Sequence, residues 1–513
     1  MTDFVLALDS GTQSSRALIF DRDGNVLAKG QHAHQPMTHP EEGAVEQDFG
    51  DIRCCLFQSI VDALAEWGGD PKSIAGAALT SQRLCVAPLR EDGEPLSNAV
   101  SWLDRRVATG ASFGGLLGKT LRLMGDDALL PRLLTKSHPR IWAERAPDLL
   151  AKADRIATVE AWLIQQLTGR LAMAPGGMVG AVPADPKTRG WASQPLLHKL
   201  LGYKPEWLCD IVEAGQRIGG ITADVAKETG LPEGLPVFAC GGDKQAESLG
   251  AGLRATSRGV AQVSLGTASS VSVTTGVHRA SLRYRWITVC ACEPGAWNLE
   301  YMLFRGMWTA AWFARNFGGE LRPAAQERGL PIEALLCEEA GLVPAGSEGV
   351  MTWPRWSPTI QSPTETGTVS GVREVHTRAH LFRSLLEGIA FDLRRGRDLL
   401  ENVTGAPITE IRVGGGGSRS DVVVQILADV FGLPVLRPPS EELAARGAAI
   451  VAAAAAGLHP SLDAAVAAMV PEAPRVLPIP ANVALYDRLY SEVFVPGLDD
   501  LSPLFSALHH ARR

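Results

Sequence analysis

Apolar residues at the start of the chain fall in short runs separated by polar turns. Residues 4–8 are apolar and lead into a polar segment that contains one glycine, and residues 17–20 form a second apolar run. Residues 21–25 (Asp-Arg-Asp-Gly-Asn) are typical of a tight turn, and residues 26–30 read as a third strand. The chain is therefore predicted to open with three strands joined by two turns.

A similar pattern returns in the second half of the chain. Residues 259–264 lead into Leu265-Gly266-Thr267, and residues 270–274 follow as a strand of alternating character. Two openings of the same kind predict two lobes built on one plan. We expect their boundary near residues 251–254, so that residues 1–252 form an N-terminal lobe and residues 253–513 a C-terminal lobe.

Helices are predicted between these strands. Residues 443–457 are rich in alanine, carry Arg446 and are too short to span a bilayer, so a close-packed core helix is expected there. Helices interleaved with short strands indicate an α/β architecture. Apolar residues at helical spacing predict further helices over residues 51–67, 145–168, 378–403 and 421–431.

Length and composition narrow the class of protein. A chain of 513 residues is too long for one ordinary core, so two or more domains are expected. A net charge of −7 argues against nucleic acid or an anionic membrane as partner, because both need clustered positive charge. The first residues show no basic stretch followed by an apolar one, and the eight cysteines show no C-x-x-C spacing, so we predict free thiols in the cytoplasm.

The loop after the first strand, Asp9-Ser10-Gly11-Thr12-Gln13-Ser14-Ser15-Arg16, carries the first candidate chemistry. Gly11 lets the backbone approach an anion, Thr12, Ser14 and Ser15 offer hydroxyl groups, and Arg16 offers a charged fork for a phosphate. Asp9 at the strand end is placed to hold Mg²⁺, most simply through water. A solvated hairpin turn is the alternative reading of this loop.

A second candidate group surrounds Asp243. An apolar run over residues 236–240 and two glycines deliver this carboxylate to a loop, where a general base belongs. A helix-like stretch follows, so an N-cap is the alternative role for Asp243. Gly266-Thr267 forms a turn like that of the Asp9 loop, and the two turns are expected to grip phosphates from both sides.

Gly414 to Gly417 end a strand at residues 411–413 and open a helix. Glycines without side chains would let a flat ligand such as adenine lie against the backbone. This run is not a G-x-x-x-x-G-K-[ST] loop, and a flexible connector is the alternative.

Taken together, these motifs resemble the FGGY family of carbohydrate kinases over nearly the whole chain. LALDSGTQSSRALIFD (residues 6–21) is close to the first phosphate motif of glycerol kinases, and GGDKQAESLGAG (241–252) resembles the family's catalytic-aspartate segment. SLGTASSVSV (264–273) resembles its second phosphate motif, and VGGGGSRSDVVVQILADVFGLPV (413–435) its adenine-side motif.

The most specific match is GTVSGVREVHTRAHLFRSLLE (367–387), which fits the C-terminal signature of the family. The N-terminal signature departs from the pattern, because its lysine-to-tryptophan spacing is not kept around residues 136–142.

The resemblance implies two actin-like lobes, each with a ribonuclease-H-like core, with sugar and ATP in the cleft between them. It implies that Asp243 is the general base and that Asp9 supports Mg²⁺. It assigns sugar and phosphates to residues 1–252 and adenosine to residues 253–513, and it allows a homodimer. The residues implied to bind the cofactor ATP are Gly11, Thr12, Gln13, Ser14, Arg16, Gly266 and Thr267 on the phosphate side and Gly415, Gly416, Gly417 and Ser418 on the adenosine side.

The sugar is less closely defined. Gln82-Arg83 is similar to glycerol kinases, but those carry a glutamate next, and Leu84 stands here. A site without that acceptor should bind glycerol less well. Trp102-x-Asp104-x-Arg106 looks more like the xylulose-type kinases, although core packing is the alternative for Trp102. The candidate sugar-binding residues are Gln82, Arg83, Trp102, Asp104, Asp243, Lys244 and Gln245.

The expected function is therefore ATP-dependent phosphorylation of a small sugar or polyol, with a ketopentose such as xylulose favoured and glycerol as the alternative. An actin-fold ATPase would share the twin phosphate turns but lack the signature at residues 367–387. A non-catalytic sugar sensor is a third alternative, which the presence of both Asp9 and Asp243 disfavours.

Overall fold

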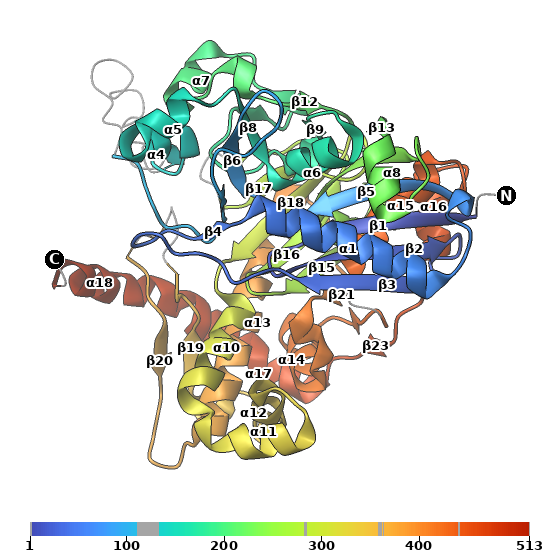
Figure 1. Cartoon of the computed structure of the whole chain (residues 1–513). Coiled ribbons are helices and arrows are strands. Elements are labelled where there is room, and N and C mark those ends of the chain that lie inside the picture. Colours follow the sequence, from blue (N-terminus) through green and yellow to red (C-terminus); the bar gives the residue numbers. More distant parts are fainter. Residues whose placement is uncertain are drawn as a thin grey trace.

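The computed structural model describes residues 3–109, 133–281, 285–357, 362, 364–439 and 442–511. Two large β-sheets dominate it, one built only from residues 4–242 and the other only from residues 260–476 (Figure 1). The predicted boundary at residue 252 falls between the two sheets. We call the halves that carry these sheets the N-terminal and the C-terminal lobe.

The N-terminal sheet has the strand order β13-β14-β5-β1-β2-β3. The first three strands form an antiparallel meander, as predicted, and β5 and β14 add to β1 in parallel. Because β1 lies in the middle of the sheet, its apolar side chains are buried on both faces. The strands are β1 (Phe4–Ser10), β2 (Ser14–Asp21), β3 (Val26–Ala33), β5 (Ile74–Ser81), β13 (Arg217–Gly220) and β14 (Pro236–Gly242).

The C-terminal sheet repeats this plan in the order β17-β18-β16-β15-β21-β22-β23. Here β15, β16 and β18 form the antiparallel meander, and β21 and β22 extend it in parallel. The prediction of two lobes with one plan is therefore confirmed. The strands are β15 (Val260–Leu265), β16 (Ser269–Thr275), β17 (Ile287–Cys290), β18 (Trp297–Leu303), β21 (Glu410–Gly414), β22 (Val435–Leu436) and β23 (Arg475–Val476).

Smaller sheets decorate both lobes. The four-stranded sheet of the N-terminal lobe contains β4 (Glu46–Gln47), β7 (Ala99–Val100), β6 (Val86–Leu89) and β8 (Arg155–Thr158). The two-stranded pairs are β10 (Ala184–Asp185) with β11 (Gly190–Trp191), β12 (Asp210–Ile211) with β9 (Ala172–Met173), and β19 (Met351–Trp353) with β20 (Thr368–Ser370).

The helices of the described residues pack on and around the two large sheets. In the N-terminal lobe they are α1 (Phe49–Trp67), α4 (His138–Arg145), α5 (Pro147–Ala151), α6 (Val159–Thr168), α7 (Pro195–Leu201), α8 (Ala223–Thr229) and α9 (Asp243–Gly250). In the C-terminal lobe they are α10 (Gly306–Phe317), α11 (Arg322–Arg328), α12 (Ile332–Gly341), α13 (Arg378–Thr404), α14 (Asp421–Phe431), α15 (Leu443–Ala455), α16 (Leu462–Met469), α17 (Pro480–Arg488) and α18 (Val495–Ala511).

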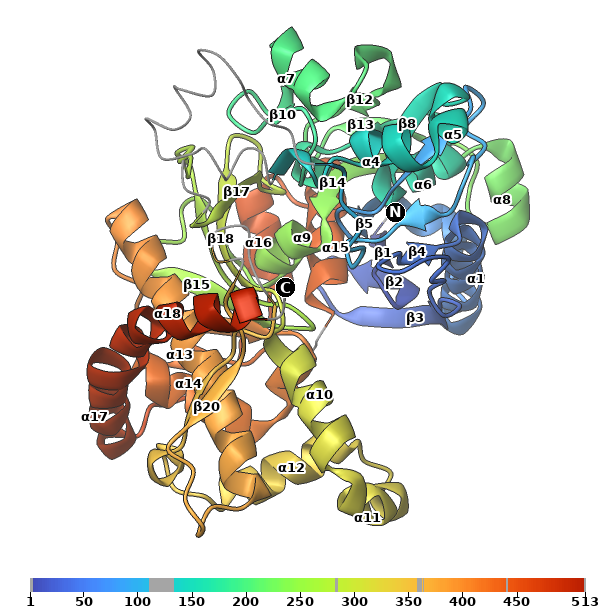
Figure 2. The ribbon, with the colours of Figure 1, turned by 90° about the vertical axis from the view of Figure 1, so that its left-hand side faces the viewer.

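Helices α9 and α15 lie between the two sheets (Figure 2). Helix α15 packs on β1, β5 and β14 of the N-terminal sheet, while α9 packs on α15 and also contacts β16 of the C-terminal sheet. Helix α1 packs on β2 and β3, and α10 and α13 pack on the C-terminal sheet. Although α15 comes late in the sequence, it therefore belongs by packing to the N-terminal sheet.

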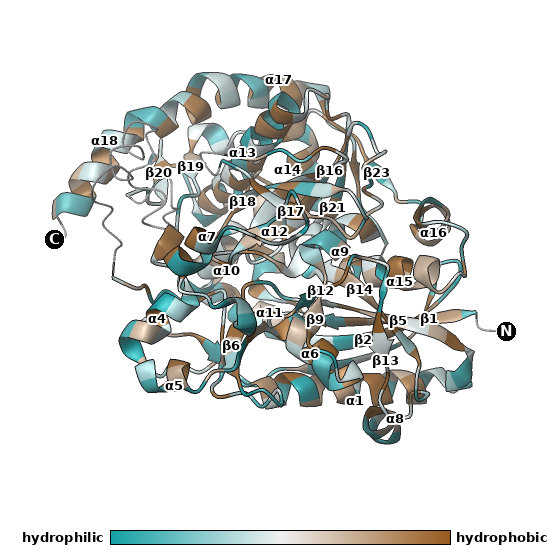
Figure 3. Cartoon of the chain, turned by 90° about the horizontal axis from the view of Figure 1, so that it is seen from above, coloured by the Kyte–Doolittle hydropathy of each residue, from teal (hydrophilic) through white to brown (hydrophobic). Residues whose placement is uncertain are grey.

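The alanine-rich helix α15 is the close-packed core helix that the sequence predicts. Its residues from Ala445 to Ala453 are buried, and the helix is mostly apolar in colour where it passes the strands of the N-terminal sheet (Figure 3). Two glycines allow α9 and α15 to touch backbone to backbone. A Cβ atom at Gly447 would lie 1.9 Å from the Ala246 carbonyl oxygen, and one at Gly250 would lie 1.9 Å from the Leu443 carbonyl oxygen.

One predicted helix is wrong. Residues 145–168 do not form one helix, because β8 separates α5 from α6. Ile156 and Ala157 bury their side chains in the strand, and Thr158 then caps α6 by accepting the Ala161 N–H. The apolar spacing of two adjacent elements combines here into an apparent helical period.

The remaining helix predictions agree with the structure. The C-terminal tail adds buried aromatic side chains to the core of the C-terminal lobe. Beyond α17, a π-helix at Leu489–Phe494 leads into α18, and Tyr486 and Phe494 are buried in the core of the C-terminal lobe. Within the described part of the chain, no helix combines the length and apolar character that crossing a membrane requires.

We predict that Gly447→Ala destabilises the protein. Alanine favours a helix over glycine by about 1 kcal/mol, but the new methyl group would collide with the Ala246 backbone, and overpacking of this kind costs about 1–3 kcal/mol. The free energy of unfolding measured by urea titration should therefore fall.

Gly319→Ala is the matched control, because a Cβ atom at Gly319 meets no atom within 4 Å among the described residues. If both variants unfold at the same urea concentration as the parent, a methyl group fits at Gly447 and the predicted collision with the Ala246 backbone does not occur.

Candidate active site

Asp243 lies at the junction of β14 and α9. Gly241, inside β14, adopts φ +137°, which favours glycine, at the point where the pairing with β5 shifts its register. Gly242 is the N-cap residue and Asp243 the first residue of α9, so the alternative reading of Asp243 as the N-cap is wrong. Its carboxylate accepts the Lys244 N–H at 2.8 Å and is 30% exposed, so it remains accessible at the helix start.

Asp9 ends β1 at the same edge of the sheet. β1 and β14 both run parallel to β5, so their carboxyl ends meet. The Asp9 side chain is 5% exposed and lies 3.2 Å from the Arg16 guanidinium. Burial raises the pKa of Asp9 to about 7; Arg16 lowers it, while the charges of Asp243 and Glu442 raise it further.

The loop between β1 and β2 is tight and polar. The Gly11 N–H donates to the Ser14 carbonyl oxygen, and the nearest atom to a Cβ at Gly11 would be that oxygen at 3.6 Å. The Thr12 hydroxyl accepts the Trp102 indole N–H at 3.0 Å, and Gln13 is exposed.

Two hydroxyls of this loop are already engaged inside the lobe. Ser14 Oγ accepts a hydrogen bond from Gln31 Nε2, and the fully buried Ser15 bonds to His34 Nε2 at 2.9 Å. Ser15 therefore points into the N-terminal lobe, whereas Gly11, Thr12 and Gln13 form the accessible part of the turn.

The matching turn of the C-terminal lobe joins β15 to β16. Its Gly266 and Thr267 carbonyl oxygens accept the N–H groups of Met307 and Trp308 at the start of α10. A Cβ atom at Gly266 would lie 3.9 Å from Lys244 Nζ, so this turn lies beside the start of α9.

The glycine run at residues 414–417 packs against the same region. A Cβ atom at Gly414 would lie 2.9 Å from a Glu247 carboxylate oxygen, and one at Gly415 would lie within 3 Å of the Leu265 backbone. Gly417 faces the Leu265 and Met307 side chains as closely. Only Gly416 of the four would meet no atom of the described residues within 4 Å, so most of this run is glycine for internal packing.

Ser418 closes the glycine run. Its hydroxyl donates to the Gly415 carbonyl oxygen at 2.7 Å, within a 3₁₀ turn at Gly416–Arg419 that leads into α14. The run is thus an ordered turn, and the alternative of a flexible connector is not supported.

Gln82 and Arg83 follow β5 and lie next to Asp243. Arg83 Nε is 3.7 Å from an Asp243 carboxylate oxygen, and its side chain crosses Gly242 so closely that a Cβ there would lie 2.6 Å from it. Gln82 Nε2 donates to Gln47 Oε1 at 2.9 Å, and Gln47 Nε2 in turn donates to the Thr12 carbonyl oxygen.

Two buried amide oxygens in this region are free. Gln82 Oε1 and Gln245 Oε1 have no hydrogen-bond partner among the described residues, although Gln82 and Gln245 are 2% and 1% exposed. Buried amide oxygens normally accept a hydrogen bond, so both are suited to accept one from a polar ligand. Trp102, which also packs partly on the N-terminal core, links this group to Thr12.

Two predicted sugar-binding residues, Asp104 and Lys244, are already paired with other side chains. Asp104 is 5% exposed, pairs with the Arg106 guanidinium at 2.8 Å and accepts the Val45 N–H. Lys244 Nζ donates to Glu247 at 2.8 Å and to Ser264 Oγ at 2.6 Å. Burial alone would lower the pKa of Lys244, but Glu247 and Asp243 outweigh it and raise that pKa.

Two carboxylates were missed in the sequence analysis, Glu300 of the C-terminal sheet and Glu442 directly before α15. Glu300 of β18 accepts from Arg83 at 3.0 and 3.1 Å and from Gln245, and Glu442 lies 3.7 Å from Arg16. A glutamate inside the apolar strand Trp297–Leu303 is a signal that could have been noticed. Nothing in the sequence around Glu442 distinguishes it.

The donor set for Mg²⁺ is small. Over the residues that the structure describes, no group of three or more His, Cys, Asp or Glu side chains is arranged to hold a metal ion. Mg²⁺ in phosphoryl-transfer sites needs only one or two carboxylates, because phosphates and water supply the other ligands. Asp9 fits this pattern, since a cation would relieve the repulsion that Asp243 and Glu442 exert on it.

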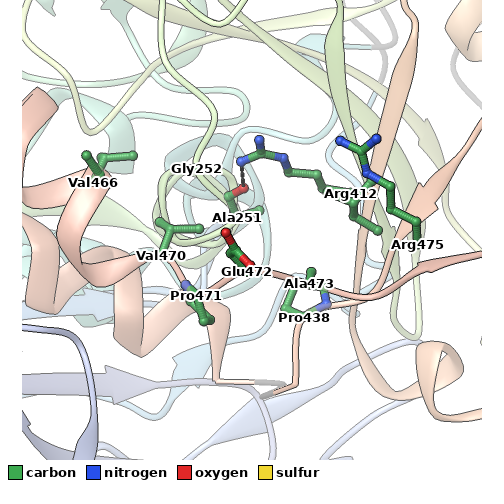
Figure 4. A pocket seen from close by; sticks show the side chains of 12 residues that line it. Ala251, Gly252, Arg412, Pro438, Val466, Val470, Pro471, Glu472, Ala473 and Arg475 are labelled. Carbon is green, nitrogen blue, oxygen red and sulfur yellow. Dashed lines mark hydrogen bonds between the residues drawn. The ribbon is translucent and has the colours of Figure 1, made fainter.

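A cavity of about 550 Å³ lies at the opposite end of α9 (Figure 4). Ala251 and Gly252 line it together with Arg412, whose guanidinium donates to the Ala251 carbonyl oxygen at 2.7 Å. None of the predicted site residues lines this cavity, so it is separate from the group around Asp243.

The comparisons with known proteins identify the family. The FGGY family of carbohydrate kinases matches with its N-terminal domain over residues 4–250 and with its C-terminal domain over residues 261–456. The chain is 29% identical to the sugar kinase YgcE of Escherichia coli (strain K12) over 492 residues, covering 96% of this chain and 92% of that protein.

Other relatives carry different substrate names. A glycerol kinase of Alkalilimnicola ehrlichii is 30% identical, covering 92% of this chain and 94% of its own. An autoinducer-2 kinase of Yersinia pestis is 31% identical, covering 90% and 88%. The crystal structure of xylulose kinase from Rhodospirillum rubrum has a TM-score of 0.78 at 25% identity, covering 98% of this chain and 100% of that chain. This likeness confirms the predicted α/β fold of two actin-like lobes.

We predict that Asp9→Asn stabilises the ligand-free protein at high pH. Because the pKa of Asp9 rises from 3.8 to about 7 on folding, its contribution to stability is greatest below about pH 4 and is lost as the pH rises to about 7. Asparagine stays neutral, so the variant should melt several degrees above the parent at pH 8, with a smaller difference at pH 5.

Asp500→Asn, at an exposed position in α18, is the control and should leave the melting temperature unchanged at both pH values. An Asp9→Asn variant that melts below the parent by the same amount at pH 5 and pH 8 would contradict the raised pKa.

Proposed function

This chain belongs to the FGGY family of carbohydrate kinases, and from that premise we propose that it transfers the γ-phosphoryl group of ATP to a hydroxyl group of a ketopentose or similar polyol. As a member of this family it is a phosphotransferase that acts on a sugar hydroxyl. ATP as donor, the kind of sugar and the roles of single residues are the content of the proposal.

The accessible carboxylate of Asp243 is the observation that carries it. Asp243 is 30% exposed at the start of α9. The other carboxylates nearby are nearly buried and form ion pairs with arginine or lysine side chains: Asp9, Glu300 and Glu247. We assign Asp243 as the base that accepts the proton of the sugar hydroxyl while the hydroxyl oxygen attacks the γ-phosphorus and ADP leaves. Arg83 beside it would orient the attacking hydroxyl.

The two turns would bind the phosphates. In this assignment Gly11, Thr12, Gln13 and Arg16 of the N-terminal lobe face Gly266 and Thr267 of the C-terminal lobe. Ser14 contributes by holding the turn, since its hydroxyl already bonds to Gln31. Mg²⁺ bound at Asp9 would neutralise phosphate charge.

Adenosine would bind on the C-terminal side. Gly416 is the open position of the glycine run, and Gly415, Gly417 and Ser418 shape the turn around it. We therefore retain residues 1–252 as the sugar- and phosphate-binding lobe and residues 253–513 as the adenosine-binding lobe, with α15 packed across the boundary.

A ketopentose is preferred over glycerol because of residue 84. Leu84 adopts φ +63°, an unusual conformation for leucine, and its side chain lies against Gly180, so it offers no acceptor for a hydroxyl. The unpartnered amide oxygens of Gln82 and Gln245 are two further acceptors in the same region. The xylulose kinase and autoinducer-2 kinase relatives are consistent with an acceptor other than glycerol.

Glycerol remains the second candidate, because glycerol kinases share 30% identity and Gln82-Arg83 resembles their motif. We further propose a cytoplasmic location, since all eight cysteines are free. A sugar-independent ATPase is disfavoured by the signature at residues 367–387, which such enzymes lack.

We predict that Asp243→Asn lowers turnover by at least about 10²-fold, the low end for loss of a general base. Steady-state kinetics by coupled ADP release would measure the change. Asp224→Asn, an exposed aspartate in the first turn of α8, is the matched control and should keep parental turnover. Near-normal turnover of Asp243→Asn would remove the proposed base.

A coupled ADP-release screen across ketopentoses, polyols and glycerol identifies the acceptor. We expect a ketopentose to give a higher kcat/KM than glycerol and ADP release without sugar to be slow, because water should not replace the sugar as acceptor. Equal ADP release with and without every sugar would instead indicate an ATPase.

A further inference from the structure

Glu300 is a buried carboxylate that the mechanism above does not use. It lies on β18 of the C-terminal sheet with 2% of its side chain exposed, yet it bonds to Arg83 of the N-terminal lobe and to Gln245 of α9. Both of its oxygens accept from Arg83, at 3.0 and 3.1 Å, and one accepts from Gln245 Nε2 at 2.5 Å.

Arg83 lies between two carboxylates. Its terminal nitrogen bonds to Glu300, while its Nε lies 3.7 Å from Asp243, beyond direct hydrogen-bond length. Burial alone would lower the pKa of Arg83, but the charges of Glu300 and Asp243 outweigh it, so the guanidinium stays charged. The stronger bond to Glu300 keeps Arg83 from closing fully on Asp243.

Gln245 is held in the same way. Because its Nε2 donates to Glu300, its Oε1 is the atom left without a partner in the described part of the chain. Since Gln245 Nε2 makes no other hydrogen bond among the described residues, this bond sets which end of the buried amide faces Glu300. One glutamate thus sets the orientation of two residues of the proposed sugar site.

We propose that Glu300 is a positioning residue of the sugar site: it draws Arg83 away from Asp243, so that the Asp243 carboxylate stays open to the sugar, and it sets which end of the buried Gln245 amide is left without a partner. The inference rests on the proposed function and deepens it. It also means that the sugar site depends on a carboxylate from the C-terminal lobe.

A merely structural role of Glu300 predicts different behaviour. An ion pair that only joins the lobes would, when lost, lower stability and affect sugar and ATP alike. A positioning role affects the sugar selectively, because Arg83 and Gln245 are assigned to the sugar and not to the nucleotide.

The test compares Glu300→Gln and Glu300→Asp with the parent, using the sugar found in the ADP-release screen. Hydrogen bonds to charged groups contribute enough to change affinity about 10- to 100-fold, so we expect Glu300→Gln to raise the KM for sugar by this factor. The KM for ATP should change less than about twofold, because Arg83 and Gln245 are assigned to the sugar and not to the nucleotide. Glu300→Asp keeps the charge and should recover part of the loss.

Glu293→Gln is the matched control, because Glu293 also accepts from a buried arginine, Arg254, and from a backbone N–H. Among the described residues it makes no hydrogen bond or ion pair with Arg83, Gln245 or Asp243. The control variant should keep the parental KM values. Melting temperatures show whether each variant is folded. If Glu300→Gln does not fold, the comparison is made with Glu300→Asp instead.

A crystal structure of Glu300→Gln adds a measurement that needs no sugar. We expect Arg83 to move from 3.7 Å to direct hydrogen-bond distance from Asp243. An unmoved Arg83, or equal losses for sugar and ATP, would overturn the proposal even if the parent proves to be a sugar kinase. Failure of Asp243→Asn to lose activity would instead overturn the proposed function.

Discussion

The backbone contact between α9 and α15 is the constraint on which the site depends. Both helices lie between the two sheets, and at Gly250 and Gly447 they are too close for any side chain. Since α9 begins at Asp243, this packing sets where the proposed base stands relative to both lobes. Any residue larger than glycine at the contact would have to push α9 away from α15. The small residues of α15 are therefore part of the geometry of the site, although none of them is proposed to touch a ligand.

On the side that faces the C-terminal sheet, away from α15, helix α9 is held by hydrogen bonds instead of close backbone packing. Lys244, Glu247 and Ser264 bond to one another, and Ser248 and Ser272 share the Gln262 side chain. Buried polar groups are costly unless they are paired, and these bonds pair most of the polar atoms between α9 and the C-terminal sheet, with Gln262 Nε2 unpartnered among the described residues. The network therefore favours one arrangement of α9 on that sheet. This explains Lys244 better than a role in sugar binding, since its ammonium group already has two partners in this network.

Two arginines repeat one electrostatic arrangement. Arg16 lies between Asp9 and Glu442, the residue before α15, and Arg83 lies between Asp243 and Glu300 in the same manner. Each arginine thus balances two carboxylates that are far apart in the sequence, and Glu300 comes from the C-terminal sheet. The arrangement keeps several acidic groups close together without leaving them unpaired, and it links the charge of the site to the relative placement of the lobes.

The sequence by itself determined the elements and the loops that carry the chemistry. The strand–turn–strand openings, the helices from residues 421 and 443, and Asp9 and Asp243 at strand ends follow from local pattern, because hydrophobic period and turn residues act over a few positions. The exception at residues 145–168 arose where two elements share one apparent period.

Only the tertiary structure decided which side chains meet. Glu300 and Glu442 reach arginines more than 200 positions away in the sequence, and Asp104 turned to Arg106 where a sugar contact had been expected. Most glycines of the 414–417 run proved to be there for contact with Leu265 and its neighbours, not for a ligand alone. Pairings of this kind depend on how two sheets pack around α9 and α15, and no local pattern of apolar and polar residues encodes that distance.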